Sequence, residues 1–145
     1  MNYLDIKLPG SDLKTHTLRD FSGSKVVLYF YPKDQTPGCT VEAREFTKLK
    51  EEFNAKGYII IGVNRDSVKS HLAFIQNNHL NLLLLSDESE ELVRAFSVLV
   101  EKSMFGKKYL GIERSTFVLG ESGQIQHEYR KVSPKEHPVR ILEEL

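Results

Sequence analysis

Short runs of apolar residues alternate along the chain with longer segments in which apolar positions recur at helical spacing. Residues 25–31, 58–63 and 82–85 are dominated by apolar residues without alternation, the pattern of strands that are covered on both faces. Helical spacing fills residues 40–56 and residues 66–78 between these runs. This alternation predicts an α/β fold with a largely parallel sheet.

The second half of the chain contains the same two kinds of segment. The pattern predicts, in order, a helix capped by residues 86–87, a hairpin-like excursion at 104–112, strands at 115–119 and 124–130 joined by a glycine-containing turn, and a last helix at 134–145. No internal repeat or linker divides these elements, and we expect a single domain spanning residues 1–145.

Composition and charge narrow the class of protein. Hydrophobic residues make up 40% of the chain and charged residues 28%, as in ordinary globular proteins. Twenty basic residues balance twenty acidic ones, so nothing predicts binding to nucleic acid or to an anionic membrane. The longest apolar run, residues 26–31, is far too short to span a bilayer, and Asp5 interrupts the start of the chain, where a secretory signal is apolar. We therefore expect a cytoplasmic protein.

The chain contains a single cysteine, Cys39. One thiol excludes a disulfide within the chain and excludes zinc sites that need several thiolates. The five histidines, at positions 16, 71, 79, 127 and 137, show no ligand-like spacing, and we expect them at the surface or at helix ends. We therefore expect neither a metal nor another cofactor.

Cys39 lies where a buried strand ends, a turn-forming loop intervenes and a helix begins. The free backbone N–H groups and the partial positive charge of a helix start favour a thiolate over a thiol. The alternative is that Cys39 is a small buried hydrophobic residue, which is the commoner role of a lone cysteine. Its place in the loop sequence Thr36-Pro-Gly-Cys39 argues against inert packing, so we predict a reactive thiol.

Three neighbours of Cys39 have both a chemical and a plain interpretation. The Thr36 hydroxyl can fold back to exchange hydrogen bonds with the thiolate, or it can simply cap the helix. Pro32 can shield the thiolate from water or merely end the strand. Glu42 can orient a cationic side chain or complement the helix dipole. None of the three decides the function by itself.

Taken together, the segment Tyr31-Pro-Lys-Asp-Gln-Thr-Pro-Gly-Cys-Thr-Val-Glu42 resembles the active-site signature of the peroxiredoxins, in particular of their bacterioferritin-comigratory, or Q-type, branch. Similar segments continue from roughly residue 3 to the C-terminus, and they include Gly106-Lys-Lys-Tyr109 and Gly111-Ile-Glu-Arg-Ser-Thr-Phe117. The resemblance implies a thioredoxin-like α/β fold of the peroxiredoxin type, with a central mixed sheet flanked by helices.

The resemblance also implies a role for each residue of the site. Cys39 is expected as the peroxidatic cysteine, Thr36 as a hydrogen-bond partner of thiolate and peroxide, and Pro32 as a shield of the pocket. Arg114 is expected as the cationic partner of the thiolate, with Glu42 helping to hold it. From the residues alone Arg114 is only an arginine before a strand, so its pairing with Cys39 rests on the resemblance. A guanidinium stays charged at physiological pH and suits the negative oxygen that develops as the O–O bond breaks.

One departure from the Q-type pattern changes the expected cycle. Many members carry a second cysteine five residues after the first, where this chain has Arg44. We therefore expect a thiol-dependent peroxidase that reduces hydrogen peroxide and organic hydroperoxides, forms a sulfenic acid on Cys39 and depends on an external thiol. That thiol belongs to a low-molecular-weight compound, to a thioredoxin- or glutaredoxin-like protein, or to Cys39 of a second copy. The chain itself is expected as a monomer or weak homodimer.

Other interpretations of the same residues stay open. A peroxide sensor or relay, in which oxidised Cys39 passes its oxidation to a partner protein, uses the same loop. A thioredoxin-type disulfide reductase needs a second thiol, which the chain lacks, and a purely structural role is the remaining alternative. Lys102, Lys107, Lys108 and Arg114 form a mildly basic stretch, which is either a solvated face or an attraction for an acidic reductant.

Overall fold

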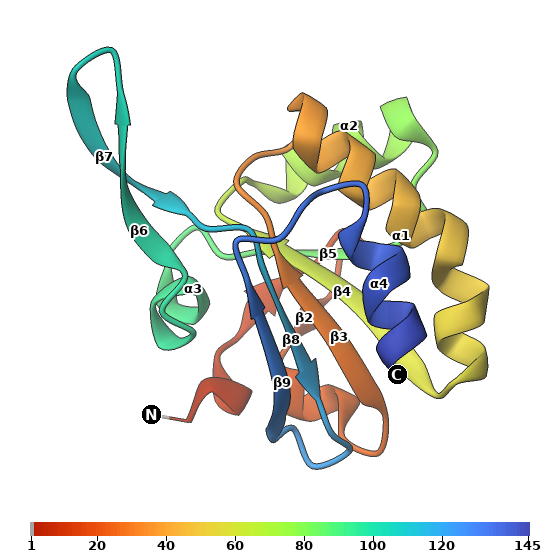
Figure 1. Ribbon diagram of the computed structural model, residues 1–145. Coiled ribbons are helices and arrows are strands. Elements are labelled where there is room, and N and C mark those ends of the chain that lie inside the picture. The colour runs from red at the N-terminus through yellow and green to blue at the C-terminus, as the bar shows by residue number, and fades with distance from the viewer. Residues whose placement is uncertain (1) are drawn as a thin grey trace.

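A five-stranded mixed sheet forms the centre of the protein in a computed structural model that describes residues 2–145 (Figure 1). Its strands, in spatial order, are β5 (Leu83–Ser86), β4 (Tyr58–Asn64), β3 (Lys25–Phe30), β8 (Ser115–Leu119) and β9 (Ile125–Arg130). β3 pairs in parallel with β4, and β4 with β5, whereas β8 runs antiparallel to both β3 and β9. The α/β fold with a central mixed sheet is confirmed, but the largely parallel sheet expected from the pattern alone is wrong. A short turn joins β8 to β9, and a turn of this length connects antiparallel strands, because parallel strands need a long crossover.

Helices cover both faces of this sheet. The helices are α1 (Pro37–Ala55), α2 (Val68–Asn78), α3 (Glu91–Ala95) and α4 (His137–Glu144), with the 3-10 helices η1 (Tyr3–Asp5) and η2 (Leu18–Phe21). α1, α2 and α4 contribute to the core on one face, where α1 and α4 lie side by side (Figure 1). α3, η1 and η2 pack on the opposite face. Among residues 2–145, no helix is long and apolar enough to cross a membrane.

Both faces of β3 are buried, which explains why its sequence is apolar without alternation. Side chains point to opposite faces along a strand, so Val27 and Tyr29 join the core under α1 while Leu28 and Phe30 join the core on the other face. A strand that is covered on both faces needs apolar residues at successive positions. The end of β3 is therefore buried too, and the loop toward Cys39 begins in the interior of the protein.

Some elements begin at other residues than the pattern predicts. α1 begins at Pro37 rather than at residue 40, which places Cys39 inside its first turn. β9 begins at Ile125 rather than at residue 124, and α4 begins at His137 rather than at residue 134. The earlier start of α1 matters for function, because it puts the thiol among the free N–H groups of the helix start.

Two further strand pairs lie outside the central sheet. They are the short ribbon of β1 (Leu8–Pro9) with β2 (Thr15–His16) and the hairpin of β6 (Leu99–Met104) with β7 (Lys107–Ile112). The ribbon has no counterpart among the predicted elements, since two-residue strands are too short to show a pattern. The hairpin begins five residues earlier than the predicted excursion at 104–112, and it projects away from the body of the protein (Figure 1).

Candidate active site

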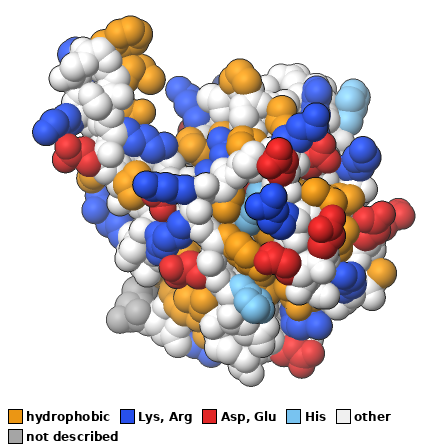
Figure 2. Space-filling view, viewed as in Figure 1, with side chains coloured by type: hydrophobic (Ala, Val, Ile, Leu, Met, Phe, Trp, Pro, Cys, Tyr) orange, Lys and Arg blue, Asp and Glu red, His pale blue; other side chains and the backbone are white. Residues whose placement is uncertain are grey.

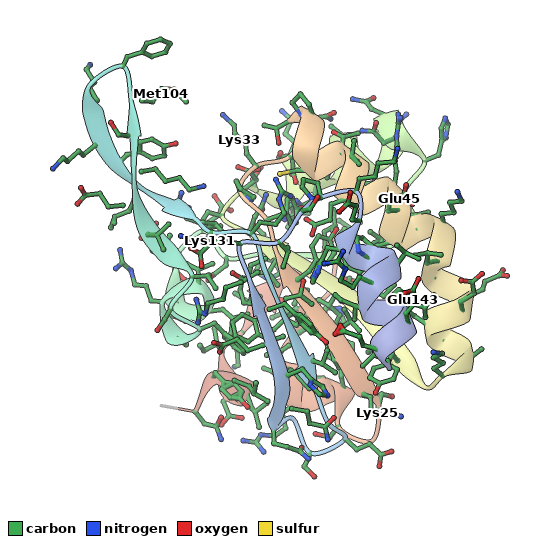
Figure 3. All side chains as sticks on the ribbon, viewed as in Figure 1. Lys25, Lys33, Glu45, Met104, Lys131 and Glu143 are labelled. Atoms are coloured by element: carbon green, nitrogen blue, oxygen red, sulfur yellow. The ribbon has the colours of Figure 1, made fainter. Side chains whose placement is uncertain are left out.

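Cys39 lies at one end of the central sheet, in the first turn of α1. The loop that follows β3 leads to this end of the sheet. Figure 3 shows Lys33 in that loop and Lys131 just after β9, both well away from Lys25 at the start of β3. Pro37 is the first residue of α1, a position that suits proline because its fixed φ matches a helix and its missing N–H is not needed. The Cys39 side chain, 1% exposed, is thus buried beside the positive end of the helix dipole.

Sheet pairing brings Arg114 to Cys39 from 75 residues away in the sequence. Ser115, the first residue of β8, pairs with Phe30 at the end of β3, and Arg114 directly precedes it. Arg114 Nη2 lies 3.5 Å from Cys39 Sγ, and Nη1 lies 2.8 Å from Oε1 of Glu42. Burial alone would lower the pKa of Arg114, but the charges of Glu42 and Cys39 outweigh it and raise that pKa above its usual value. The guanidinium is therefore held beside the sulfur in its charged form.

Glu42 holds Arg114 from the same helix that carries Cys39. The two residues are three positions apart in α1, so their side chains lie on one face of the helix. The Glu42 side chain is fully buried, and burial raises its pKa to about 7 although the charge and hydrogen bond of Arg114 act in the opposite direction. Its Oε2 atom has no hydrogen-bond partner among the residues that the structure describes. A buried carboxylate of this kind costs free energy, and Arg114 offsets that cost.

Gly38 provides the space for the guanidinium. A Cβ atom built at this position would lie 3.1 Å from Arg114 Nη2 and 3.4 Å from Cγ of Pro134, in the loop before α4. A side chain at residue 38 would therefore push against the arginine, the proline loop or both. The glycine before Cys39 leaves this space open, and a Cβ here would require the guanidinium or Pro134 to shift by a few tenths of an ångström.

Thr36 and Pro32 both lie in the segment between β3 and α1, and the Thr36 hydroxyl bonds within that segment rather than to Cys39. The Thr36 hydroxyl donates to the carbonyl of Lys33 at 2.7 Å, and the Thr36 carbonyl accepts a hydrogen bond from the Thr40 hydroxyl at 2.7 Å. In the part of the chain that the structure describes, no hydrogen bond joins the Thr36 hydroxyl to Cys39. Pro32 is partly buried in the loop that follows β3. The catalytic roles of Thr36 and Pro32 stay predictions.

Comparison with known proteins identifies the family. The model of the AhpC/TSA family matches residues 2–128 of this chain. The chain belongs to the AhpC/TSA family. Peroxiredoxin Bcp of Bacillus subtilis is 45% identical over 97% of this chain and 90% of its own length. Peroxiredoxin Bcp of Xanthomonas campestris is 48% identical over 95% of this chain and 86% of its own length.

Solved structures place this peroxiredoxin in the Bcp/PrxQ group and confirm its thioredoxin-like fold. The bacterioferritin comigratory protein of Xanthomonas campestris has a TM-score of 0.93 and 46% identity, covering 98% of this chain and 90% of that chain. PrxQ of Xylella fastidiosa has a TM-score of 0.94 and 38% identity, covering 99% of this chain and 91% of that chain. Peroxiredoxin Q of Xanthomonas campestris has been solved with a serine at either of two different cysteine positions, whereas this peroxiredoxin has only Cys39.

A buried network beneath the loop between β3 and α1 fixes the path of this peroxiredoxin's chain toward Cys39. The Asp34 carboxylate is its centre, and it accepts hydrogen bonds from Tyr31 at 2.6 Å, Ser70 at 2.7 Å, His71 at 2.7 Å and Asn64 at 3.3 Å. Burial would raise the pKa of Asp34, but these hydrogen bonds and the charge of His71 outweigh it and lower that pKa. The loop is therefore tied to both β4 and α2.

His71 carries the charge that matches Asp34. Its ring is fully buried in α2, with Nδ1 facing Asp34 Oδ2 and Nε2 lying 3.1 Å from the carbonyl oxygen of Leu85. Both partners are acceptors, and an imidazolium, in which both ring nitrogens donate, satisfies both contacts. The expectation that the histidines lie at the surface or at helix ends is wrong for His71. No signal in the sequence pairs it with Asp34, which lies 37 residues away.

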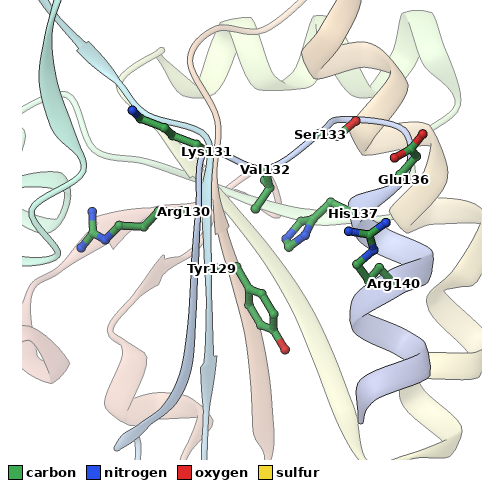
Figure 4. Close-up of a pocket in the computed structure, with 8 residues that line it drawn as sticks. All are labelled: Tyr129, Arg130, Lys131, Val132, Ser133, Glu136, His137 and Arg140. Carbon is green, nitrogen blue, oxygen red and sulfur yellow. The ribbon is translucent and has the colours of Figure 1, made fainter.

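A pocket of about 410 Å³ lies between β9 and α4, next to the loop that contacts Gly38 (Figure 4). Tyr129, His137 and Arg140 are among the side chains that line it. His137 Nε2 lies 2.8 Å from the Thr116 hydroxyl, and burial, with the charges of Arg140 and Arg114, lowers its pKa to about 4. In the described chain neither Cys39 nor Arg114 lines this pocket, so it is separate from the Cys39 sulfur. Between residues 2 and 145, no three His, Cys, Asp or Glu side chains are grouped so as to hold a metal ion.

Proposed function

We propose that this thiol peroxidase reduces hydrogen peroxide and organic hydroperoxides with Cys39 as its only redox-active group. The observation that carries the proposal is the 3.5 Å contact between Arg114 Nη2 and Cys39 Sγ, with Glu42 holding the other guanidinium nitrogen at 2.8 Å. A cation fixed at this distance favours the thiolate, which is the nucleophilic form of cysteine. The related protein of Xanthomonas campestris is described for its alkyl peroxide reduction activity, which supports the same substrate class here.

In the first step the Cys39 thiolate attacks the terminal oxygen of the peroxide. A sulfur–oxygen bond forms, the O–O bond breaks, and the leaving oxygen takes up a proton and departs as water or an alcohol. Arg114 and the free N–H groups at the start of α1 stabilise the negative charge on the leaving oxygen. We assign Thr36 to align the bound peroxide through its hydroxyl and Pro32 to keep water from the sulfur. The product on Cys39 is a sulfenic acid.

The second half of the cycle needs a thiol from outside the chain, because Cys39 is the only cysteine. An external thiol condenses with the sulfenic acid, releasing water and leaving a mixed disulfide on Cys39. A second thiol then attacks the external sulfur of that disulfide and releases the Cys39 thiolate. Two electrons and two protons thus come from the reductant for each peroxide that is reduced.

Mass spectrometry and steady-state turnover test this cycle together. One equivalent of hydrogen peroxide is expected to add one oxygen atom to Cys39, and a thiol added afterwards is expected to form a mixed disulfide there. Continuous peroxide consumption with a generic thiol supports a peroxidase, whereas a single stoichiometric oxidation that stops would support a sensor instead. Peroxide turnover that survives intact in Cys39→Ser would overturn the assignment of the nucleophile.

A further inference from the structure

The hairpin of β6 and β7 exposes an apolar tip that the body of the protein does not cover. Met104 is 57% exposed, Phe105 98%, Tyr109 43% and Leu110 49%. Figure 2 shows hydrophobic and basic side chains together on this projecting arm, and Figure 3 shows Met104 near its tip. The most exposed of these side chains is a phenylalanine, which gains nothing in the isolated chain by its position.

The backbone conformation at the tip is unfavourable for phenylalanine. The two-residue turn consists of Phe105 and Gly106, which have φ angles of 52° and 79°. Turns with two positive φ angles favour asparagine or aspartate followed by glycine, and a bulky residue in this conformation is a rare outlier. Phe105 is therefore unfavourable for the turn and is not buried within the chain. Its side chain is therefore available for a contact with another molecule.

Charge identifies the kind of molecule that fits the arm. The strands carry Lys102, Lys107 and Lys108 against one acid, Glu101, whose Oε1 lies 3.4 Å from Nζ of Lys108. Lys107 has no ion-pair partner among residues 2–145. An apolar tip flanked by excess lysine is complementary to a surface that is apolar with acidic groups at its rim.

The base of the arm is fixed beside the active site. β7 ends at Ile112, two residues before Arg114, and Lys102 Nζ donates to the carbonyl of Ile112 at 2.7 Å. Arg65, which directly follows β4, donates from Nη2 to the carbonyl of Leu110 at 3.1 Å. A strand rises ~3.3 Å per residue, so the tip stands roughly 17 Å from the base. A molecule that contacts both the tip and the base of the arm must span a distance of this order, which suits a protein domain and exceeds a small thiol.

We propose that the β6–β7 hairpin is a docking arm for a protein dithiol reductant that presents an apolar, acid-rimmed surface around its reactive cysteine. This inference rests on the proposed function, because it concerns the thiol that resolves Cys39. With the arm engaged, one thiol of the partner condenses with the Cys39 sulfenic acid, releasing water and forming an intermolecular disulfide. The partner's second thiol then attacks the partner's sulfur atom in that disulfide. The partner leaves with an internal disulfide, and the Cys39 thiolate is regenerated.

Phe105→Asn tests the arm without weakening its turn, because asparagine is favoured at this φ angle. With thioredoxin, thioredoxin reductase and NADPH as the probe, we expect the KM for thioredoxin to rise by roughly tenfold or more, the effect of losing one interface anchor. Turnover with dithiothreitol and single-turnover oxidation by peroxide are expected to be unchanged. Lys107→Gln combined with Lys108→Gln is expected to raise the same KM and to reduce its dependence on salt.

Leu13→Asn is the matched control, since Leu13 is 76% exposed and has a φ of 67° in the turn between β1 and β2. This variant is expected to leave every rate unchanged. An unchanged KM in Phe105→Asn, or wild-type protein that turns over with dithiothreitol but not with thioredoxin, overturns the docking arm while the proposed peroxidase stands. A failure with dithiothreitol as well overturns the proposed function itself. If wild-type protein sediments as a dimer and Phe105→Asn as a monomer, the tip binds a second copy and the docking proposal is wrong.

Discussion

Asp34→Asn is expected to destabilise the protein far more than an ordinary surface substitution, because it breaks a buried charge pair. Asp34 and His71 have side chains that are 1% and 0% exposed, and their atoms lie 2.7 Å apart. The substitution keeps the size of the side chain but removes the negative charge, so the imidazolium is left without a partner. One carboxylate oxygen also becomes an NH₂ group, which cannot accept the hydrogen bonds that Ser70 and His71 donate to Oδ2.

The expected magnitude follows from these losses. Removing one partner of a buried ion pair costs about 3–5 kcal/mol, and each hydrogen bond to a charged group contributes about 1.5–3 kcal/mol. We therefore expect Asp34→Asn to lower the free energy of unfolding by about 3–5 kcal/mol, a large fraction of the about 5–15 kcal/mol of a typical domain. Urea unfolding followed by circular dichroism at neutral pH measures the change directly.

Asp12→Asn provides a matched control in the same chain. Asp12 also faces a histidine at 2.7 Å, but the side chains of His16 and Asp12 are 15% and 38% exposed. Water screens this pair, so we expect its loss to cost less than about 1 kcal/mol. The reasoning is refuted if Asp34→Asn and Asp12→Asn lower the free energy of unfolding by the same small amount.

Three further predictions concern the residues around the sulfur. Arg114→Gln removes the cation beside the leaving oxygen, so it is expected to slow oxidation of Cys39 by peroxide about 10²–10³-fold in stopped-flow measurements. A rate within a factor of about two of wild type would count against that role. Gly38→Ala is expected to slow the same step while the protein stays folded by circular dichroism, since the new Cβ would meet Arg114 Nη2 at 3.1 Å; an unchanged rate would show that the arginine needs no such space. The Glu42 pKa is raised from 4.5 to about 7 in the folded protein, so its contribution to stability is complete below pH 4.5 and is lost as pH rises through about 7. Glu42→Gln lacks this loss, and a stability difference between it and wild type that does not change with pH would contradict the assignment.

The order of elements and the position of Cys39 could be predicted from the sequence because both depend on local patterns. The continuous apolar run of β3, the turn-forming residues before Cys39 and the helical spacing that follows all lie within one short segment. A reactive thiol at a strand-to-helix junction needs no knowledge of the rest of the chain.

The remaining parts of the site depend on contacts between distant segments. Arg114 reaches Cys39 only because Ser115 pairs with Phe30, and no local pattern specifies which strands become neighbours. Its assignment from sequence therefore needed the resemblance to peroxiredoxins. His71 looked like an ordinary histidine of an amphipathic helix, and only the folded chain brings Asp34 to it. The antiparallel pairing of β3 with β8 has no local signal either, whereas the short turn between residues 119 and 124 does predict that β8 and β9 are antiparallel.

The burial of Cys39 affects the two halves of the proposed cycle differently, because peroxide is small and a protein thiol is large. With 1% of its surface exposed in the first turn of α1, the sulfur is open to a molecule as small as a peroxide far more readily than to a bulky thiol. In the proposed cycle, a bulky reductant would reach a sulfenic acid at this position mainly when the first turn of α1 opens. The lifetime of the oxidised protein is then set by the opening of one helical turn, and a longer lifetime gives a second peroxide more time to carry the sulfur to the irreversible sulfinic acid. The stability of that turn thus balances protection of the thiolate against self-inactivation.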